Sequence, residues 1–169
     1  MDESIKIKLK KEVDLSPLIA LMEASGVDFK NRKLNGPFGM ATYLSVYLDV
    51  DKLLDCFNTR MIWFIILHEM GHFRRIQKMG KDKPISMFSL EDYDAFCNHI
   101  ISEEIFADRY ACFIYYLNNK QEFPRLATQQ LYLVENQQRY KMAIQPLFGV
   151  VKNKEENYIQ LFESYIIQD

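Results

Sequence analysis

The chain has 169 residues, of which 49% are hydrophobic and 26% are charged, a balance typical of a single globular domain. A formal net charge of −2 argues against nucleic acid as a partner that is recognised through overall charge. The longest apolar run, Met61 to Leu67, is far shorter than the roughly 20 residues that span a bilayer. We therefore expect a partner that is neither nucleic acid nor membrane.

The cysteines and the start of the chain indicate a compartment. The first residues carry no signal-peptide pattern. Cys56, Cys97 and Cys112 are widely spaced and form no CxxC pair, so neither a disulfide framework nor a thiolate zinc site is predicted. Free thiols fit a reducing environment, and we expect a cytoplasmic protein with Cys97 and Cys112 in its core.

The first fifty residues predict short elements. Ile or Leu alternates with Lys over residues 5–10, a period of two that predicts a strand. The Ser-Pro pair at 16–17 predicts a helix start, and Gly26 can end that helix. Residues 27–40 are rich in Asn, Gly and Pro and predict a loop, whereas residues 42–50 (TYLSVYLDV) alternate and predict a second strand.

The middle of the chain predicts two long helices. Thr59 can cap a helix that runs to about Met79, with the following glycine as its stop. Its first half is apolar on every side, which is typical of a helix that is buried all round. A Ser-x-x-Asp capping box at 89–92 opens the second helix, which runs to about Asn118.

Residues 120–169 predict a helical C-terminal extension. One helical pattern lies between Pro124 and Pro146, and a final helix carries an apolar stripe. The stripe is most simply a face docked on the protein's own core, and the alternative is a homodimer contact. With the two short strands, the chain is predicted to be α+β, mainly helical with a small sheet.

Residues 68–72 read His-Glu-Met-Gly-His, the HExxH pattern, on the predicted buried helix. Residues four apart share one face of a helix, so His68 and His72 can offer two imidazole nitrogens to one Zn²⁺ ion. Glu69 is then beside the metal and can take a proton from a zinc-bound water. Gly71 keeps the helix thin, so that another segment can approach.

A catalytic zinc needs a third protein ligand, and the second helix supplies candidates. Glu104 and Asp108 are again four apart, with small Ala107 nearby. Glu104 could complete a site with two histidines and one glutamate, and Asp108 could accept a hydrogen bond from a ligand histidine. Glu103 is the rival ligand, and we favour Glu104 because only it has the aspartate one turn on.

These two segments together resemble the gluzincin metallopeptidases, and most closely the compact ImmA/IrrE-like group. Members of that group show HExGH followed by an ExxA(D/N)x(F/Y)A segment, and this chain reads HEMGH followed by EIFADRYA from Glu104. The resemblance covers roughly residues 40–115. It implies a zincin-like domain with its motif-bearing core at about 40–118, and a zinc-dependent peptidase acting on a peptide or protein substrate, often a regulatory protein linked to mobile elements.

The resemblance also implies a place for the substrate, because residues 42–50 would form the edge strand that pairs with an extended peptide. The residue that would polarise the scissile carbonyl stays open among four candidates. These are Tyr110, Tyr115, Tyr116 and His99.

Two other hypotheses compete with an active enzyme. The first is a non-catalytic zinc-binding regulatory or interaction module of mobile-element origin, for which a closed site with His99 as a fourth ligand would be evidence. The second is a protease-derived regulator that has lost activity, against which the retention of the ligands and the base argues. A basic stretch at 74–83 is most simply a solvated face, and could alternatively attract an acidic substrate or nucleic acid.

Overall fold

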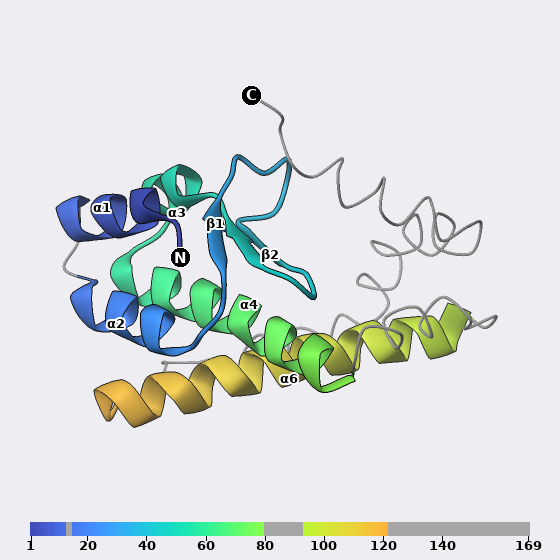
Figure 1. The fold of residues 1–169 in the computed structure, drawn as a ribbon. Coiled ribbons are helices and arrows are strands. Elements are labelled where there is room, and N and C mark those ends of the chain that lie inside the picture. The colour runs from blue at the N-terminus through green and yellow to red at the C-terminus, as the bar shows by residue number, and fades with distance from the viewer. Residues whose placement is uncertain (13–14, 80–92, 122–169) are drawn as a thin grey trace.

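The computed structural model describes residues 1–12, 15–79 and 93–121, and for residues 11, 12, 79 and 93–99 it describes the backbone alone. The described part is α+β, mostly helical with one three-stranded sheet, as predicted (Figure 1). In chain order the elements are α1 (Glu3–Glu12), α2 (Ser16–Ala24), β1 (Phe29–Asn31), β2 (Gly39–Ala41), β3 (Val46–Leu48), α3 (Val50–Cys56), α4 (Thr59–Met79) and α6 (Tyr93–Asn119).

The predicted strand at residues 5–10 is wrong, because these residues belong to helix α1. Ile5 and Leu9 are fully buried whereas Ile7 is 58% exposed. A strand would place all three side chains on one face, while a helix places only residues four apart together. The alternation of apolar residues and lysines contained both periods, and burial selects the helical one.

Helix α2 follows the prediction for residues 16–26. Pro17 lies in its first turn, where its missing N–H is not needed. Gly26 adopts φ +70°, a left-handed conformation that glycine takes at little cost, just after the helix ends. Leu15, rather than Ser16, occupies the position that precedes the helix.

The sheet has the strand order β1-β3-β2, with β1 parallel and β2 antiparallel to β3. The loop predicted at 27–40 is therefore wrong at β1 and β2, since strands of three residues between turn-forming residues show almost no periodicity. The strand predicted at 42–50 is shorter than expected, and it is central. Thus the expected edge strand is also wrong, because β2 and not β3 lies at the edge nearest α4.

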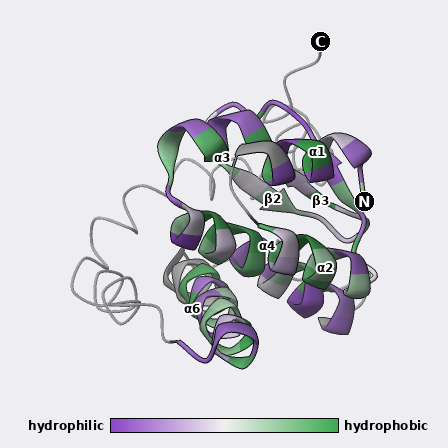
Figure 2. Ribbon diagram, turned by 90° about the vertical axis from the view of Figure 1, so that its left-hand side faces the viewer, coloured by the Kyte–Doolittle hydropathy of each residue, from purple (hydrophilic) through white to green (hydrophobic). Residues whose placement is uncertain are grey.

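Helix α4 is the centre of the fold, with the sheet on one side and α6 on the other (Figures 1 and 2). Its predicted bounds are confirmed, although the side chain of Asn58, and not Thr59, accepts the cap hydrogen bond from Met61 N–H at 3.0 Å. Its apolar half is buried at five of seven positions, but Met61 is 36% exposed and Ile65 is half-buried, so the prediction of burial on every side is wrong at these two residues. Ile62, Trp63, Phe64, Ile66 and Leu67 are each at most 5% exposed.

Helix α6 packs along α4, and its end at Asn119 agrees with the prediction. The capping box at 89–92 and the C-terminal extension with its apolar stripe lie outside the described residues. Of the three cysteines, Cys56 is exposed, Cys112 is half-buried, and the side chain of Cys97 is not described. No helix in the described part of the chain has the length and apolar character needed to cross a membrane.

Candidate metal centre

Helices α4 and α6 are in close contact at Gly71. A Cβ atom added there would lie 2.9 Å from Cα of Ala107 and 3.1 Å from Cβ of Tyr110. Both Ala107 and Ala111 are fully buried, which agrees with the expectation that small residues line this helix contact. Because the two backbones nearly touch, polar side chains one turn away from Gly71 can meet across the interface.

Three such side chains converge on one point. Nε2 of His68 lies 3.0 Å from Nε2 of His72. Glu104 presents one carboxylate oxygen 3.3 Å from His68 Nε2 and the other 3.4 Å from His72 Nε2. Among the described residues, these three form the group whose geometry could hold a metal ion.

The separations fit a single small cation. Ligand atoms at about 2.0–2.1 Å from a tetrahedral zinc ion lie about 3.3–3.4 Å apart. The two imidazole nitrogens lie 3.0 Å apart, and each lies 3.3 or 3.4 Å from a different oxygen of the Glu104 carboxylate, so all three side chains are within reach of one ion. Imidazole nitrogens and a carboxylate oxygen are also donors that zinc prefers. The residues present therefore fit a zinc ion.

Glu104 forms the most exposed side of this group, although all three side chains are half-buried. The Glu104 side chain is 32% exposed, whereas those of His68 and His72 are 14% and 18% exposed. If these three residues held an ion, a water or substrate could take a fourth position from this side, as in catalytic zinc sites. The side chain of His99, the predicted fourth ligand of a closed site, is outside the described part.

Asp108 is hydrogen-bonded to the other ring nitrogen of His68. Its Oδ1 lies 2.8 Å from Nδ1 of His68, and its side chain is only 2% exposed. Because a carboxylate accepts, the Nδ1–H of His68 donates, and Nε2 is then the ring nitrogen directed toward His72 and Glu104. The aspartate lies in the position that its spacing predicted.

The charges in the site are strongly coupled. Burial alone would lower the pKa of His68, but hydrogen bonds to Asp108 and Glu104 outweigh it and raise that pKa to about 10. Burial alone would raise the pKa of Glu104, yet its bonds to the two histidines hold this pKa far below its usual range. Without a metal, a proton on His68 therefore supplies the positive charge that the carboxylates require.

The Glu69 side chain lies against the sheet, and it is close enough to His68, His72 and Glu104 to interact with their charges. A Cβ atom on Gly39 would lie 2.6 Å from Glu69 Cγ, so the carboxylate side chain lies directly against β2. The N–H of Ala41 donates a hydrogen bond to it. Burial raises the pKa of Glu69, and the nearby histidines reduce this effect. Sequence reasoning missed Gly39 and Ala41, and the small residues in the segment GPFGMA were the available signal.

The rival ligand Glu103 faces another partner. Nε of Arg75 donates to its carboxylate at 3.0 Å and 3.3 Å. Arg74, from the same basic stretch, donates to the carbonyl of Ser25. These two arginines thus tie α4 to neighbouring elements, which corrects the interpretation of the stretch as a solvated face at both positions. The last lysines of the stretch lie outside the described residues.

The tyrosines predicted to polarise the substrate differ in position. Tyr115 is 6% exposed and packs edge-on against Trp63, with ring centroids 5.5 Å apart, so it belongs to the core. Tyr116 is 48% exposed. Tyr110 lies against Gly71, between the two helices that carry the ligands. Of the three, Tyr110 is therefore the one next to the candidate centre.

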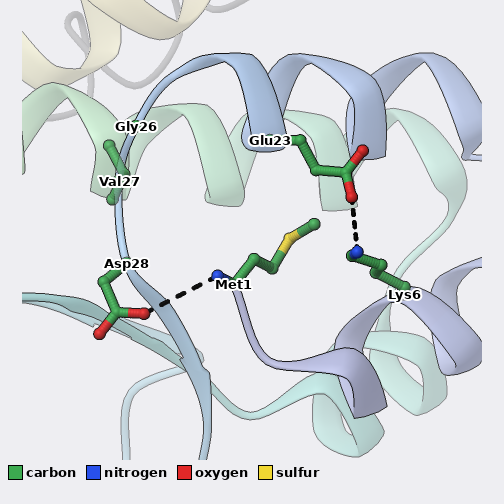
Figure 3. A pocket seen from close by; sticks show the side chains of 6 residues that line it. All are labelled: Met1, Lys6, Glu23, Gly26, Val27 and Asp28. Atoms are coloured by element: carbon green, nitrogen blue, oxygen red, sulfur yellow. Dashed lines mark ion pairs between the residues drawn. The ribbon is translucent and has the colours of Figure 1, made fainter.

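A cavity of about 340 Å³ lies elsewhere, near the N-terminus (Figure 3). Its charged groups already pair with one another. Lys6 lies 2.6 Å from Glu23, and the amino group of Met1 lies 3.9 Å from Asp28. None of its lining residues belongs to α4 or α6, so it is separate from the candidate metal centre.

Comparisons of the chain with protein-family models, with curated proteins and with solved structures find no match. Any functional conclusion therefore depends on the geometry of the site.

Proposed function

We propose that this chain is a zinc-dependent peptidase of the gluzincin type, similar to the ImmA/IrrE-like group. One observation carries the proposal. His68, His72 and Glu104 converge within 3.4 Å where α4 and α6 pack together, and a separate half-buried carboxylate, Glu69, lies beside them. Metal ligands alone would suit a structural ion, but the adjacent base suits hydrolysis.

In this proposal each residue has one role. His68, His72 and Glu104 would hold the ion, and Asp108 orients His68 through Nδ1. When bound, zinc would act as a Lewis acid and lower the pKa of a water molecule to about 7. Glu69 would accept a proton from the attacking water and deliver it to the leaving amine. Its raised pKa brings it nearer to the range in which a carboxylate exchanges protons efficiently.

The outer edge of β2 is the proposed place for the substrate backbone. Thr42 N–H donates to Ser45 C=O, and Phe38 C=O accepts from Asp49 N–H. In an antiparallel pair such residues alternate with ones whose backbone groups point away from the partner strand. Gly39 and Ala41 are those residues, and Ala41 N–H already reaches Glu69. An extended peptide pairing there would pass the ligands and the base.

Metal analysis followed by cleavage of a peptide library tests the proposal. The parent protein should contain about one zinc per chain, and His68→Ala should lose it. Glu69→Gln should keep the zinc and lose turnover, because the amide cannot accept the proton. Equal turnover by Glu69→Gln and the parent would refute the role of Glu69.

The same experiment separates the competing hypotheses. Stoichiometric zinc without cleavage of any peptide in the library would favour the non-catalytic zinc-binding module. Zinc content that is unaffected by His68→Ala or Glu104→Ala would refute the assigned site. Asp55→Ala, an exposed position on α3, is a control that should change neither zinc nor turnover.

A further inference from the structure

We propose that Arg75 is a positioning residue for the metal centre, because it holds Glu103 and so fixes the rotation of α6 at which Glu104 meets the histidines. This inference rests on the proposed function, since it assumes that the three ligands bind a metal. It concerns a pair, Arg75 and Glu103, that neither motif includes. It also explains why only one of two adjacent glutamates enters the site.

Glu104 must be placed very accurately. A side chain extends about 5–6 Å from a helix axis, so a 20° rotation of α6 would move the Glu104 carboxylate by about 2 Å. Metal–ligand distances tolerate only about 0.2 Å. The contact between Gly71 and Ala107 sets how close the helices lie, but an alanine surface alone does not prevent α6 from turning about its own axis.

Two tethers prevent that turn. At about 100° per residue, Glu103 lies about 100° from Glu104 in one direction around α6, and Asp108 lies about 40° in the other. Asp108 is bound to His68 at 2.8 Å, and Glu103 is bound to Arg75 at 3.0 Å. Because the two bonds lie on opposite sides of Glu104, rotation in either direction stretches one of them.

The Arg75 tether is well built for this task. The Glu103 side chain is only 13% exposed and that of Arg75 is 33% exposed, so the pair is partly shielded from solvent. The guanidinium also lies over the ring of Phe106, 5.0 Å from its centroid, which adds a cation–π contact to α6. Arg75 therefore contacts α6 at two residues of the turn that precedes Ala107.

The alignment of the two helices supports a common function. Each contact on α4 has a partner on α6 in antiparallel order, over two successive turns of α4. The pairs are His68 with Asp108, Gly71 with Ala107, His72 with Glu104, and Arg75 with Glu103. The three candidate metal ligands belong to the first and third of these pairs. Arg75 forms the last pair, at the opposite end of the helix contact from Asp108.

The test is a double-mutant cycle on Co²⁺ affinity, with full-length protein stripped of metal and Co²⁺ as the spectroscopic probe. Arg75→Met should weaken binding about 10- to 100-fold, as loss of partners behind the ligands does, and should alter the visible absorption of bound Co²⁺. Glu103→Gln should act similarly. The double variant should bind Co²⁺ no more weakly than the single variant with the lower affinity, because the two residues act as one unit.

Two further variants make the result specific. Arg74→Met removes the neighbouring arginine, which contacts Ser25, and should keep the parental affinity and spectrum. Arg75→Lys keeps a cation for Glu103 and should retain more affinity than Arg75→Met, which a loss of general packing would not explain. If Arg75→Met fails to fold, Glu103→Gln and Arg75→Lys still carry the test.

The outcomes distinguish this inference from the proposed function. Parental affinity and spectrum in Arg75→Met, or additive effects in the double variant, would overturn the role of Arg75 while the metal centre stands. If the parent binds no Co²⁺, or binds it equally after His68→Ala, the metal centre itself is refuted and the role of Arg75 with it.

Discussion

Replacing Gly39 with Ala should disable the base and leave the metal ligands intact. The new Cβ would lie 2.6 Å from Cγ and 3.1 Å from Cδ of Glu69, so the carboxylate must move by almost 1 Å to reach an ordinary contact. Gly39 does not have positive φ, and alanine fits its backbone. The expected effect therefore comes from the clash with Glu69 alone.

The magnitude follows from that displacement. A misplacement of about 1 Å can cost about 100-fold in rate, and we expect kcat/KM to fall by about this factor with zinc stoichiometry unchanged. Overpacking of this kind costs about 1–3 kcal/mol in the free energy of unfolding. The assays are peptide hydrolysis, metal analysis and urea unfolding.

The stability cost of Gly39→Ala can also be measured in a Glu69→Ala background, which needs no activity assay. In Glu69→Ala the atoms that Gly39→Ala would meet are absent, so the loss of stability should vanish there. Alanine could even stabilise this strand position slightly relative to glycine. A penalty of the same size in both backgrounds, or full turnover in Gly39→Ala, would show that β2 does not position Glu69.

Three further predictions concern the helix pair. Asp108→Asn should weaken zinc binding about 10- to 100-fold in a competition titration, because the amide no longer fixes the charge and orientation of His68; unchanged affinity would contradict its role. Gly71→Ala places a methyl group 2.9 Å from the backbone of Ala107 and should cost about 1–3 kcal/mol in unfolding free energy while moving Glu104 away, so urea unfolding and zinc content should both respond. For the metal-free protein, the pKa of His68 is raised to about 10, so its contribution to stability is complete below about pH 6.5 and is lost as the pH rises toward 10. Urea unfolding across this range should show falling stability, and His68→Ala should flatten the slope.

At acid pH, the stability of the metal-free protein depends on a lowered pKa rather than on a raised one. The pKa of Glu104 is lowered in the folded protein, so its stabilising contribution is present above its ordinary value of about 4.5 and is lost as the pH falls below it. Metal and protons compete for the same ligands. The pH dependence of the metal-free protein should therefore differ from that of the zinc form, in which the ion replaces the proton on His68.

Long helices were the part of the fold that the sequence predicted well. Helix α4 combines an apolar run with a polar half, and its bounds agree with the prediction. The sequence also predicted that His68 and His72 share one helical face, because residues four apart lie on the same side of a helix. The same spacing relates Glu104 to Asp108. This rule placed Asp108 one turn after Glu104, on the side of α6 that faces His68. These features are local, and local periodicity is what a single sequence records.

The sheet could not be predicted in the same way. Its strands have three residues each, too few for an alternating pattern, and the pairing of β3 with both neighbours is a long-range property. The helix at residues 3–12 was mistaken for a strand because Ile7 happens to lie between two buried residues. Only tertiary packing distinguishes an exposed isoleucine on a helix from one that faces a core.

The error at β2 changes how the chemistry of the candidate centre is interpreted. With the segment around Gly39 interpreted as a loop, Glu69 had no neighbour that determined its direction. In the structure the Glu69 side chain packs against strand β2. Gly39 leaves room for this side chain, and the N–H of Ala41 donates to its carboxylate. In the proposed function, the helix pair would supply the ligands, and the edge of the sheet would supply both the position of the base and a backbone with which a peptide could pair. Since these two parts meet only in the folded chain, the motif predicted a metal site, and the proposal of hydrolysis depends on the strand beside it.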